Sequence, residues 1–144
     1  MFIADKNTAK VLENDFERNR ALRVFDSELN PGVSWEISDA ITVVNGFVLK
    51  GNYDNFTVHP DNYERWANFK TMLTQEDDTV DIDWVRTIMS YHKPGGNHYG
   101  DIYNVGTVQS MAYSFSDNRL DLWLGDYVED PQYETISIPF LEDQ

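Results

Sequence analysis

Residues 79–125 read TVDIDWVRTIMSYHKPGGNHYGDIYNVGTVQSMAYSFSDNRLDLWLG, and this stretch decides how we expect the chain to fold. Residues 81–92 predict a helix, because Asp81 is a favourable N-cap residue and apolar residues then recur every three or four positions. Residues 107–115 and 120–124 have the alternation of strands, and the polar residues 116–119 between them predict a tight turn. The stretch therefore predicts a helix followed by an antiparallel hairpin.

The loop between this helix and the hairpin is rich in glycine. Residues 93–106, KPGGNHYGDIYNVG, contain four of the eight glycines of the chain. A loop of this kind between regular elements is a common place for a site. His92, His98 and Asp101 carry side chains that bind metals, but their spacing matches no standard zinc pattern. We therefore expect solvated loop residues here and no metal site.

The two faces of the predicted strand 107–115 differ in size. One face carries the small residues Ser110, Ala112 and Ser114 after Val108. A face of small residues indicates that another layer of the protein approaches closely. In the return strand, residues 120–124, three leucines occupy one face, and Asp121 and Trp123 occupy the other.

A second helix is predicted just before the first. Asp61 is followed three residues later by Glu64, which is the spacing of a capping box. Apolar residues then recur at helical spacing to about Gln75, namely Tyr63, Trp66, Phe69, Met72 and Leu73. The acidic residues 76–78 break this helix. Because the link to residues 81–92 is short, we expect an antiparallel helix pair packed on a sheet.

The rest of the chain reads mostly as strands. The further predicted strands are residues 2–5, 9–13, 21–27, 35–50 and 135–140. The largely buried strand 35–50 contains the apolar run of residues 41–49. The order is β-rich, then two helices, then β-rich, with no linker or repeat. We therefore predict a single α+β domain, residues 1–144, in which antiparallel sheet carries the helix pair.

Two residues in this frame have side chains suited to a site. Asn45 comes before Gly46 within the run 41–49, which is typical of a hairpin turn or of a bulge that points the side chain out of the sheet. A carboxamide N–H presented there is a neutral donor of the kind found in oxyanion holes, and a plain turn residue fits the spacing equally well. Arg65 could anchor a carboxylate, but pairing with Asp61 or Glu64 is favoured.

Composition excludes several functions. The net charge of −14 argues against nucleic acid or an anionic membrane as a partner, because phosphate binding needs a cationic patch. The absence of cysteine excludes disulfides, thiolate metal sites and a cysteine nucleophile within these 144 residues. No nucleotide-binding motif is present, so we expect no cofactor. No apolar run reaches the ~18 residues of a membrane helix, so we expect a soluble protein.

Five segments, taken in order, carry a family resemblance. They are FIADKNTAKVLE (2–13), ITVVNGFV (41–48), DNYERWANFKTML (61–73), DIDWVRTIMSYHK (81–93) and GTVQSMAYSFSDNRLDLWLGD (106–126). In this order they resemble the C-terminal half of the N-terminal-nucleophile (Ntn) hydrolases of the isopenicillin N acyltransferase type, which are linear amide C–N hydrolases close to the choloylglycine hydrolases and penicillin V acylases. The resemblance implies part of an αββα sandwich.

The resemblance also implies a mechanism and site residues. In that family an N-terminal cysteine, freed by autocatalytic cleavage, attacks a linear amide and forms a thioester. The family's oxyanion asparagine falls on Asn45 and its helix arginine, near the substrate, on Arg65. Because this chain has no cysteine, we expect it to be the C-terminal portion of a larger protein, inactive alone, whose nucleophile lies in an upstream segment.

Other interpretations stay open beside this one. The expected substrate of the full-length enzyme is a small-molecule acyl amide. The alternative is a non-catalytic binding or interaction module of the same fold, and a third interpretation is an unrelated acidic structural domain. Open sheet edges would also allow the chain to form a homo-oligomer.

Overall fold

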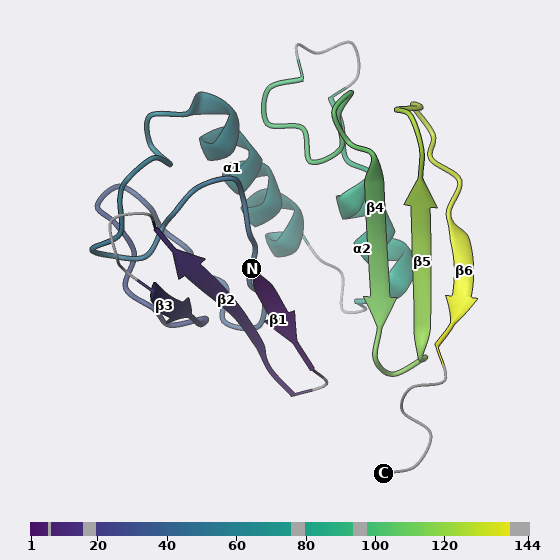
Figure 1. The fold of residues 1–144 in the computed structure, drawn as a ribbon, viewed down its shortest axis with the longest axis horizontal. Helices are drawn as coiled ribbons and strands as arrows, with labels where there is room; N and C mark the ends of the chain where they lie inside the picture. Colours follow the sequence, from purple (N-terminus) through teal and green to yellow (C-terminus); the bar gives the residue numbers. More distant parts are fainter. Residues whose placement is uncertain (6, 16–19, 76–79, 94–97, 139–144) are drawn as a thin grey trace. The chain divides into compact units, whose positions relative to one another are not determined.

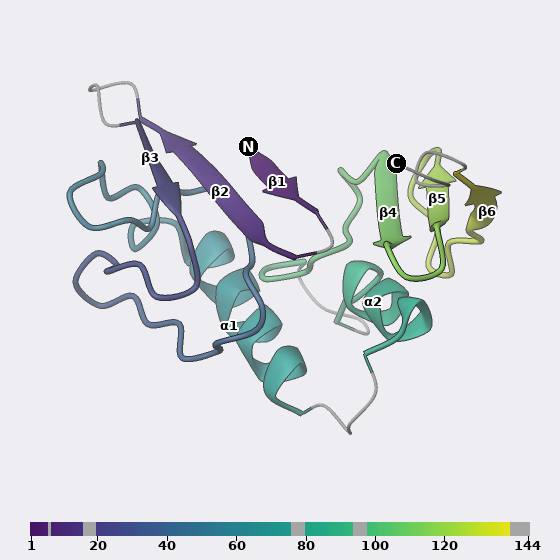
Figure 2. The same cartoon turned by 90° about the horizontal axis from the view of Figure 1, so that it is seen from below.

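The computed structural model describes residues 1–144 except 6, 16–19, 76–79, 94–97 and 139–144. The chain divides into two compact units, Met1–Gln75 and Glu76–Gln144, and each contains one three-stranded antiparallel sheet and one helix (Figures 1 and 2). The predicted α+β class is confirmed. No helix of the described residues is both long and apolar enough to cross a membrane. The helices belong to different units, so their antiparallel pairing stays a prediction, and the helix break expected at residues 76–78 lies outside the described residues.

The sheet of the first unit consists of β1 (Phe2–Ala4), β2 (Ala9–Asn14) and β3 (Arg20–Arg23) in sequence order. The predicted hairpin of residues 2–5 and 9–13 is therefore confirmed. The third strand starts one residue earlier than predicted and ends at Arg23 rather than residue 27. On β2, Val11 and Glu13 are buried, and the residues between and beside them are more exposed. This alternation gives the sheet one covered face.

The core of the first unit lies between helix α1 (Pro60–Thr74) and the irregular chain before it. The Trp66 ring on α1 is 4% exposed and contacts Trp35 and Phe56 at centroid distances of 4.8 and 5.5 Å. The buried core residues around it are Val44, Val48 and Phe56, with Leu29, Val33, Trp35 and Phe69 packed against them. The aromatic residues predicted to form one face of this helix thus include its main core residue.

The start of α1 differs from the prediction. The N-cap residue is His59, whose side chain makes no cap hydrogen bond, and Pro60 occupies the first turn. Proline favours this position because its fixed φ suits a helix start and it has no N–H to satisfy. The helix therefore begins before Asp61, and the predicted capping box of Asp61 and Glu64 is wrong. The predicted end near Gln75 is confirmed by the C-cap at that residue.

The predicted strand over residues 35–50 is wrong. The only β pairing there, within the described residues, is an isolated bridge between Leu29 and Leu49. The backbone N–H groups of Val48 and Leu49 both donate to Glu13 Oε2, each at 3.0 Å. The apolar pattern did identify buried positions, but a buried carboxylate takes the hydrogen bonds that a neighbouring strand would otherwise accept.

Glu13 joins the sheet to this segment through both carboxylate oxygens. Its Oε1 accepts from Arg23 Nε at 3.0 Å, and its Oε2 also accepts from Asn52 Nδ2 at 3.0 Å. Arg23, 2% exposed, also donates to the Thr42 carbonyl and lies 5.5 Å from the centroid of the Trp66 ring. Burial lowers the pKa of Arg23, and the neighbouring Glu13 carboxylate opposes that shift. The pair is buried and fully hydrogen-bonded, as burial of charge requires.

The second unit contains helix α2 (Ile82–Met89) and the strands β4 (Gln109–Ser114), β5 (Arg119–Leu124) and β6 (Glu134–Ser137). Asp81 is the N-cap as predicted, since its Oδ1 accepts from Trp84 N at 2.8 Å. The helix ends at Met89, three residues before the predicted His92. The Tyr91 N–H donates to the Ile88 carbonyl at 3.1 Å, three residues back, and the Lys93 N–H, which would continue the helix to the Met89 carbonyl, donates to Asp101 Oδ1 at 2.9 Å instead. The predicted hairpin is confirmed, although β4 is shorter than residues 107–115.

The second unit also contains the edge strand β6 and the turn of the hairpin. The strand β6 pairs with β5 in the sheet order β4–β5–β6. It begins one residue before the predicted strand 135–140, and residues 139 and 140 lie outside the described part. In the turn, Asn118 has φ of 53°, a left-handed conformation that asparagine adopts more readily than most residues. The predicted turn over residues 116–119 is therefore confirmed.

Helix α2 covers the small-residue face of the sheet (Figure 2). Ser110 and Ala112 on β4 are buried, and Ser110 Oγ donates to the Met89 carbonyl at 3.4 Å. The expected close approach of another layer is confirmed. The register pairs Ser110 with Trp123 and Ala112 with Asp121, so Trp123 and Asp121 face the helix as well. The leucines of β5 consequently lie on the opposite face.

Asp121 is the polar centre of this covered face. Its side chain is fully buried, and it accepts hydrogen bonds from Arg119 Nη2 at 2.7 Å, Arg86 Nη1 at 3.0 Å and Thr135 Oγ1 at 2.8 Å. Burial alone would raise the pKa of Asp121, but the hydrogen bonds and the two guanidinium charges outweigh it and lower that pKa. The carboxylate thus ties α2, β5 and β6 together.

Candidate functional site

Asn45 lies at the centre of a tight bend in the first unit. The Gly46 N–H donates to the Val44 carbonyl at 2.7 Å, which closes an inverse γ-turn around Asn45, whose φ is not positive. The Asn45 side chain is exposed, and within the described part of the chain it forms no hydrogen bond. The carboxamide is therefore directed to solvent by a turn and not by a bulge in a sheet.

The segment after the bend is held close to a second loop. The Phe47 N–H donates to Asn55 Oδ1 at 2.8 Å. A Cβ added at Gly46 would lie 3.3 Å from the Cβ of Phe56, which is fully buried. A larger residue at position 46 would therefore press on Phe56, so close packing favours glycine here.

Asn62 on α1 connects Asn45 with Arg65. Its side chain is 6% exposed, its Nδ2 donates to the Asn45 carbonyl, and its Oδ1 accepts from Arg65 Nη1 at 3.5 Å. The structure therefore places the two residues singled out from the sequence in one hydrogen-bonded network. Sequence reasoning missed Asn62. The available signal was a polar residue four positions before Trp66, on the buried face of a predicted helix.

Arg65 is held mainly by its own helix. Its Nη2 lies 2.8 Å from Asp61 Oδ2, one turn earlier, and its side chain is 12% exposed. The expected pairing with Asp61 is confirmed. Because the guanidinium keeps only a small exposed fraction, any carboxylate that reached it would add to an existing ion pair.

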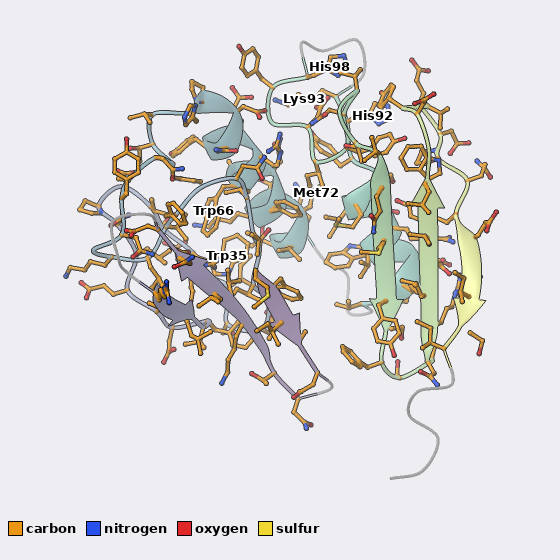
Figure 3. All side chains as sticks on the ribbon, viewed as in Figure 1. Trp35, Trp66, Met72, His92, Lys93 and His98 are labelled. Atoms are coloured by element: carbon orange, nitrogen blue, oxygen red, sulfur yellow. The ribbon has the colours of Figure 1, made fainter. Side chains whose placement is uncertain are left out.

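The three residues considered for a metal in the second unit have other partners. Asp101 is fully buried. Its Oδ1 accepts from the Lys93 N–H at 2.9 Å, and its Oδ2 lies 3.2 Å from His98 Nδ1. Figure 3 labels His92, Lys93 and His98 in this region. His92 Nδ1 lies 3.1 Å from the Ser90 carbonyl, to which it can only donate. Residues 94–97 of the glycine loop lie outside the described part. The described residues hold no group of three or more His, Cys, Asp or Glu side chains suited to a metal ion.

Aromatic rings fix the rest of this loop. Tyr103, fully buried, stacks on Tyr127 at a centroid distance of 5.1 Å and meets the Trp123 ring at 5.3 Å. The rings of His92 and His98 lie 6.4 and 6.3 Å from that of Tyr127. Burial, followed by the charge of a nearby glutamate, raises the pKa of Tyr127. The described aromatic and histidine side chains of this loop thus pack against one another within the second unit.

The chemistry available at the Asn45 network is binding and polarisation. An exposed carboxamide can donate to a developing negative charge, and a nearby guanidinium can attract an anion. The buried strand serine considered as a nucleophile, Ser110, belongs to the other unit, is 3% exposed and bonds to the Tyr133 hydroxyl at 2.6 Å. The network thus provides donors, and a nucleophile would have to come from outside these residues.

No protein-family model, curated protein or solved structure matches this chain. The site must therefore be judged on its own geometry. That geometry consists of an exposed Asn45 on a packed bend, whose backbone carbonyl is joined through the buried Asn62 side chain to Arg65 on α1.

Proposed function

We propose that the chain is the C-terminal portion of an N-terminal-nucleophile hydrolase that cleaves or transfers small-molecule acyl amides. In this proposal Asn45 donates to the oxyanion and Arg65 borders the substrate pocket. The nucleophile and its base are supplied by an upstream segment of the same protein. The two sheets and two helices would belong to the αββα sandwich of such an enzyme.

The observation that carries the proposal is the network centred on Asn62. The resemblance selects Asn45 and Arg65 from segments twenty residues apart, and a single buried side chain bonds to both. The Asn45 carboxamide is also exposed, as a group that must reach a substrate has to be. The backbone carbonyl of Asn45 accepts from Asn62 Nδ2, so the backbone that carries the side chain is tied to α1.

The proposed chemistry needs a neutral, fixed donor. When a thiolate attacks an amide carbonyl, negative charge develops on the carbonyl oxygen, and a carboxamide N–H aimed at that oxygen stabilises the transition state more than the ground state. Removal of one such donor typically lowers the rate by ~10²–10³. Arg65, already paired with Asp61, would contribute to orienting the substrate more than to the chemical step.

The test uses the chain joined to the upstream reading frame of its gene, with release of amine from a panel of acyl amides as the assay. We expect Asn45→Ala to lower kcat by about 10²–10³. The exposed Asn7→Ala in the same unit serves as a matched control and leaves the rate unchanged. Activity of Asn45→Ala within a few-fold of the parent would refute the oxyanion assignment. If translation of the natural gene started at Met1, the proposal that the chain is part of a larger enzyme would be refuted.

A binding or interaction module is the second candidate, and the exposure of the second sheet favours it. Met111, Leu124 and Ile136 share the face opposite α2 and are 47%, 63% and 41% exposed. Apolar groups gathered on one face often mark a contact surface. All residues of β1 and β6, at sheet edges, are exposed as well, which would permit a homo-oligomer. Light scattering that gives a monomer at all concentrations would exclude self-association, and the module would then need another partner.

A further inference from the structure

Strand β5 extends beyond its partner β6. Pairing between them runs from Arg119 opposite Ser137 to Leu122 opposite Glu134, and it stops there. On the other side, β4 continues to pair up to Leu124. The last residues of β5 are therefore paired on one edge only.

The hydrogen bonds around β5 show which way its end points. The Gly125 N–H donates to the Val108 carbonyl at 3.2 Å on the β4 side, and Ile138 N–H donates to the Asn118 carbonyl at 3.0 Å on the β6 side. In an antiparallel sheet the backbone groups of successive residues point to alternate edges. The backbone groups of the odd-numbered residues of β5 thus point toward β4. The backbone N–H and C=O of Leu124 point to the opposite edge, which β6 leaves open. Among the described residues, nothing on that edge bonds to the Leu124 backbone.

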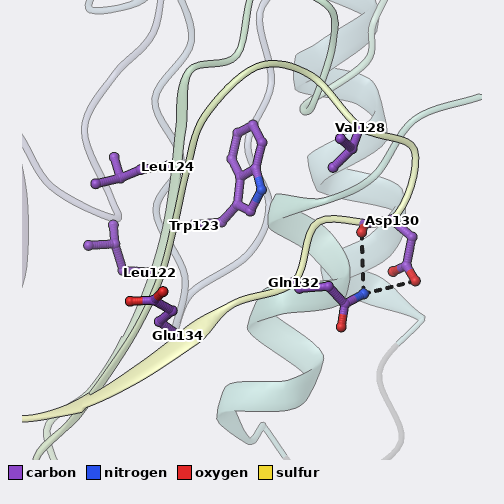
Figure 4. A pocket seen from close by; sticks show the side chains of 7 residues that line it. All are labelled: Leu122, Trp123, Leu124, Val128, Asp130, Gln132 and Glu134. Carbon is purple, nitrogen blue, oxygen red and sulfur yellow. Dashed lines mark hydrogen bonds between the residues drawn. The ribbon is translucent and has the colours of Figure 1, made fainter.

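A hollow of about 460 Å³ lies at this open edge (Figure 4). The side chains of Leu122 and Leu124 border it on one side of β5, and the loop carrying Val128 and Gln132 borders it on the other. A volume of this size is at the lower end of ligand pockets and suits a few residues of extended peptide. Unpaired backbone groups beside apolar side chains are what strand addition requires.

The charged residues that line the hollow indicate the charge of its partner. Glu134 and Asp130 both line the hollow, and Asp130 is directed by a hydrogen bond from Gln132 Nε2 to its Oδ2 at 3.0 Å. None of the described residues that line the hollow is basic. With a net charge of −14 on the whole chain, an anionic segment would be repelled and a cationic one attracted.

We propose that this hollow binds a short, extended, cationic peptide segment, which adds as a strand to the open edge of β5 and exchanges backbone hydrogen bonds with Leu124. An apolar residue opposite Leu124 packs on the leucine face, and flanking lysine or arginine pairs with Glu134 and Asp130. This site belongs to the second unit and does not depend on the proposed amide chemistry.

The test is an NMR titration of the isotopically labelled full chain with acetyl-Lys-Val-Lys-amide. We expect shifts at the Leu124 amide and the Val128 methyls, and slower exchange of the Leu124 amide proton. A probe methylated on the valine nitrogen loses one of the two bonds to Leu124 and should bind about three- to tenfold more weakly. Acetyl-Glu-Val-Glu-amide should not bind. Glu134→Gln should weaken binding, and Asp39→Asn, which removes a remote exposed charge, should not.

A second variant separates pairing from packing. Leu124→Pro removes the N–H that faces the open edge and leaves the β4 ladder intact, because proline is tolerated where the N–H is not needed. It should abolish binding while the shifts of β4 stay in place. Equal affinity for the N-methylated probe, or binding of the acidic probe, would overturn the proposal. So would a Leu124 amide already protected in the free protein, or shifts that depend on protein concentration, which would assign the edge to a second copy.

Discussion

Replacing Glu13 with glutamine should destabilise the first unit far more than a typical surface change. Glutamine keeps the shape of the side chain, but it has one acceptor oxygen where the carboxylate has two. If that oxygen keeps the bonds from Val48 and Leu49, the new NH₂ group faces the Arg23 guanidinium, and two donors meet. If it turns toward Arg23, the two backbone N–H groups lose their acceptor.

Either arrangement leaves buried groups without a partner. Removing one member of a buried ion pair typically costs ~3–5 kcal/mol, and an unsatisfied buried N–H costs ~1–3 kcal/mol. Glu13 and Arg23 are 4% and 2% exposed, so solvent cannot compensate for the loss. We therefore expect Glu13→Gln to lower the free energy of unfolding by ~3–5 kcal/mol, a large fraction of the ~5–15 kcal/mol that stabilises most domains.

Two measurements test this. Urea unfolding gives the change in stability, and amide hydrogen exchange of the Val48 and Leu49 N–H groups reports on their bonds to Glu13. Glu28→Gln is a matched control because it removes the same charge from an exposed pair with Lys50, in which the Glu28 side chain is 72% exposed. Such pairs are worth ~0–1 kcal/mol. If Glu13→Gln costs no more than Glu28→Gln and the two amides stay protected, the carboxylate does not replace a strand and our reasoning about residues 35–50 fails.

Three further predictions follow from the same contacts. The pKa of Asp121 lies below its ordinary 3.8, so the stability that this carboxylate contributes is complete above about pH 4 and is lost as the pH falls through the lowered pKa. Asp121→Asn should therefore flatten an acid titration followed by the NMR shift of the Trp123 indole N–H, and an unchanged profile would contradict this. Gly46→Ala should cost ~1–3 kcal/mol in urea unfolding, since its Cβ would press on Phe56, and a neutral result would show that the bend can relax. Asn62→Leu should cost ~1–3 kcal/mol and speed amide exchange at Gly46, because the Asn45 carbonyl loses its donor; retained protection there would remove Asn62 from the network.

The local elements could be predicted where the signal lies within a few residues. Asp81 fixes the start of α2, and the polar residues 116–119 form the hairpin turn, so both were correct from sequence. The strand expected over residues 35–50 failed because its partner is a single side chain 35 residues away, Glu13. An apolar run indicates burial, but it does not tell which groups will accept the backbone hydrogen bonds.

The same limit applies to the candidate site. Asn45 and Arg65 were selected by resemblance, and their connection depends on Asn62, a residue whose role appears only when the bend and α1 are brought together. Burial of an asparagine on the apolar face of a helix is a signal visible in the sequence, since such a group must find partners. The identity of those partners is decided by tertiary contacts and was not predictable.

The orientation of β5 shows the limit of hydrophobicity as a guide, because it points to the wrong face of the strand as the one that packs against α2. Three leucines would be expected to face the helix, yet Asp121 and Trp123 do so. The reason lies in the neighbouring strand. The small residues Ser110 and Ala112 leave room for α2 to approach, and the turn pairs them with Trp123 and Asp121. The guanidinium groups that neutralise the aspartate then make its burial possible, and the leucines remain on a face available for binding.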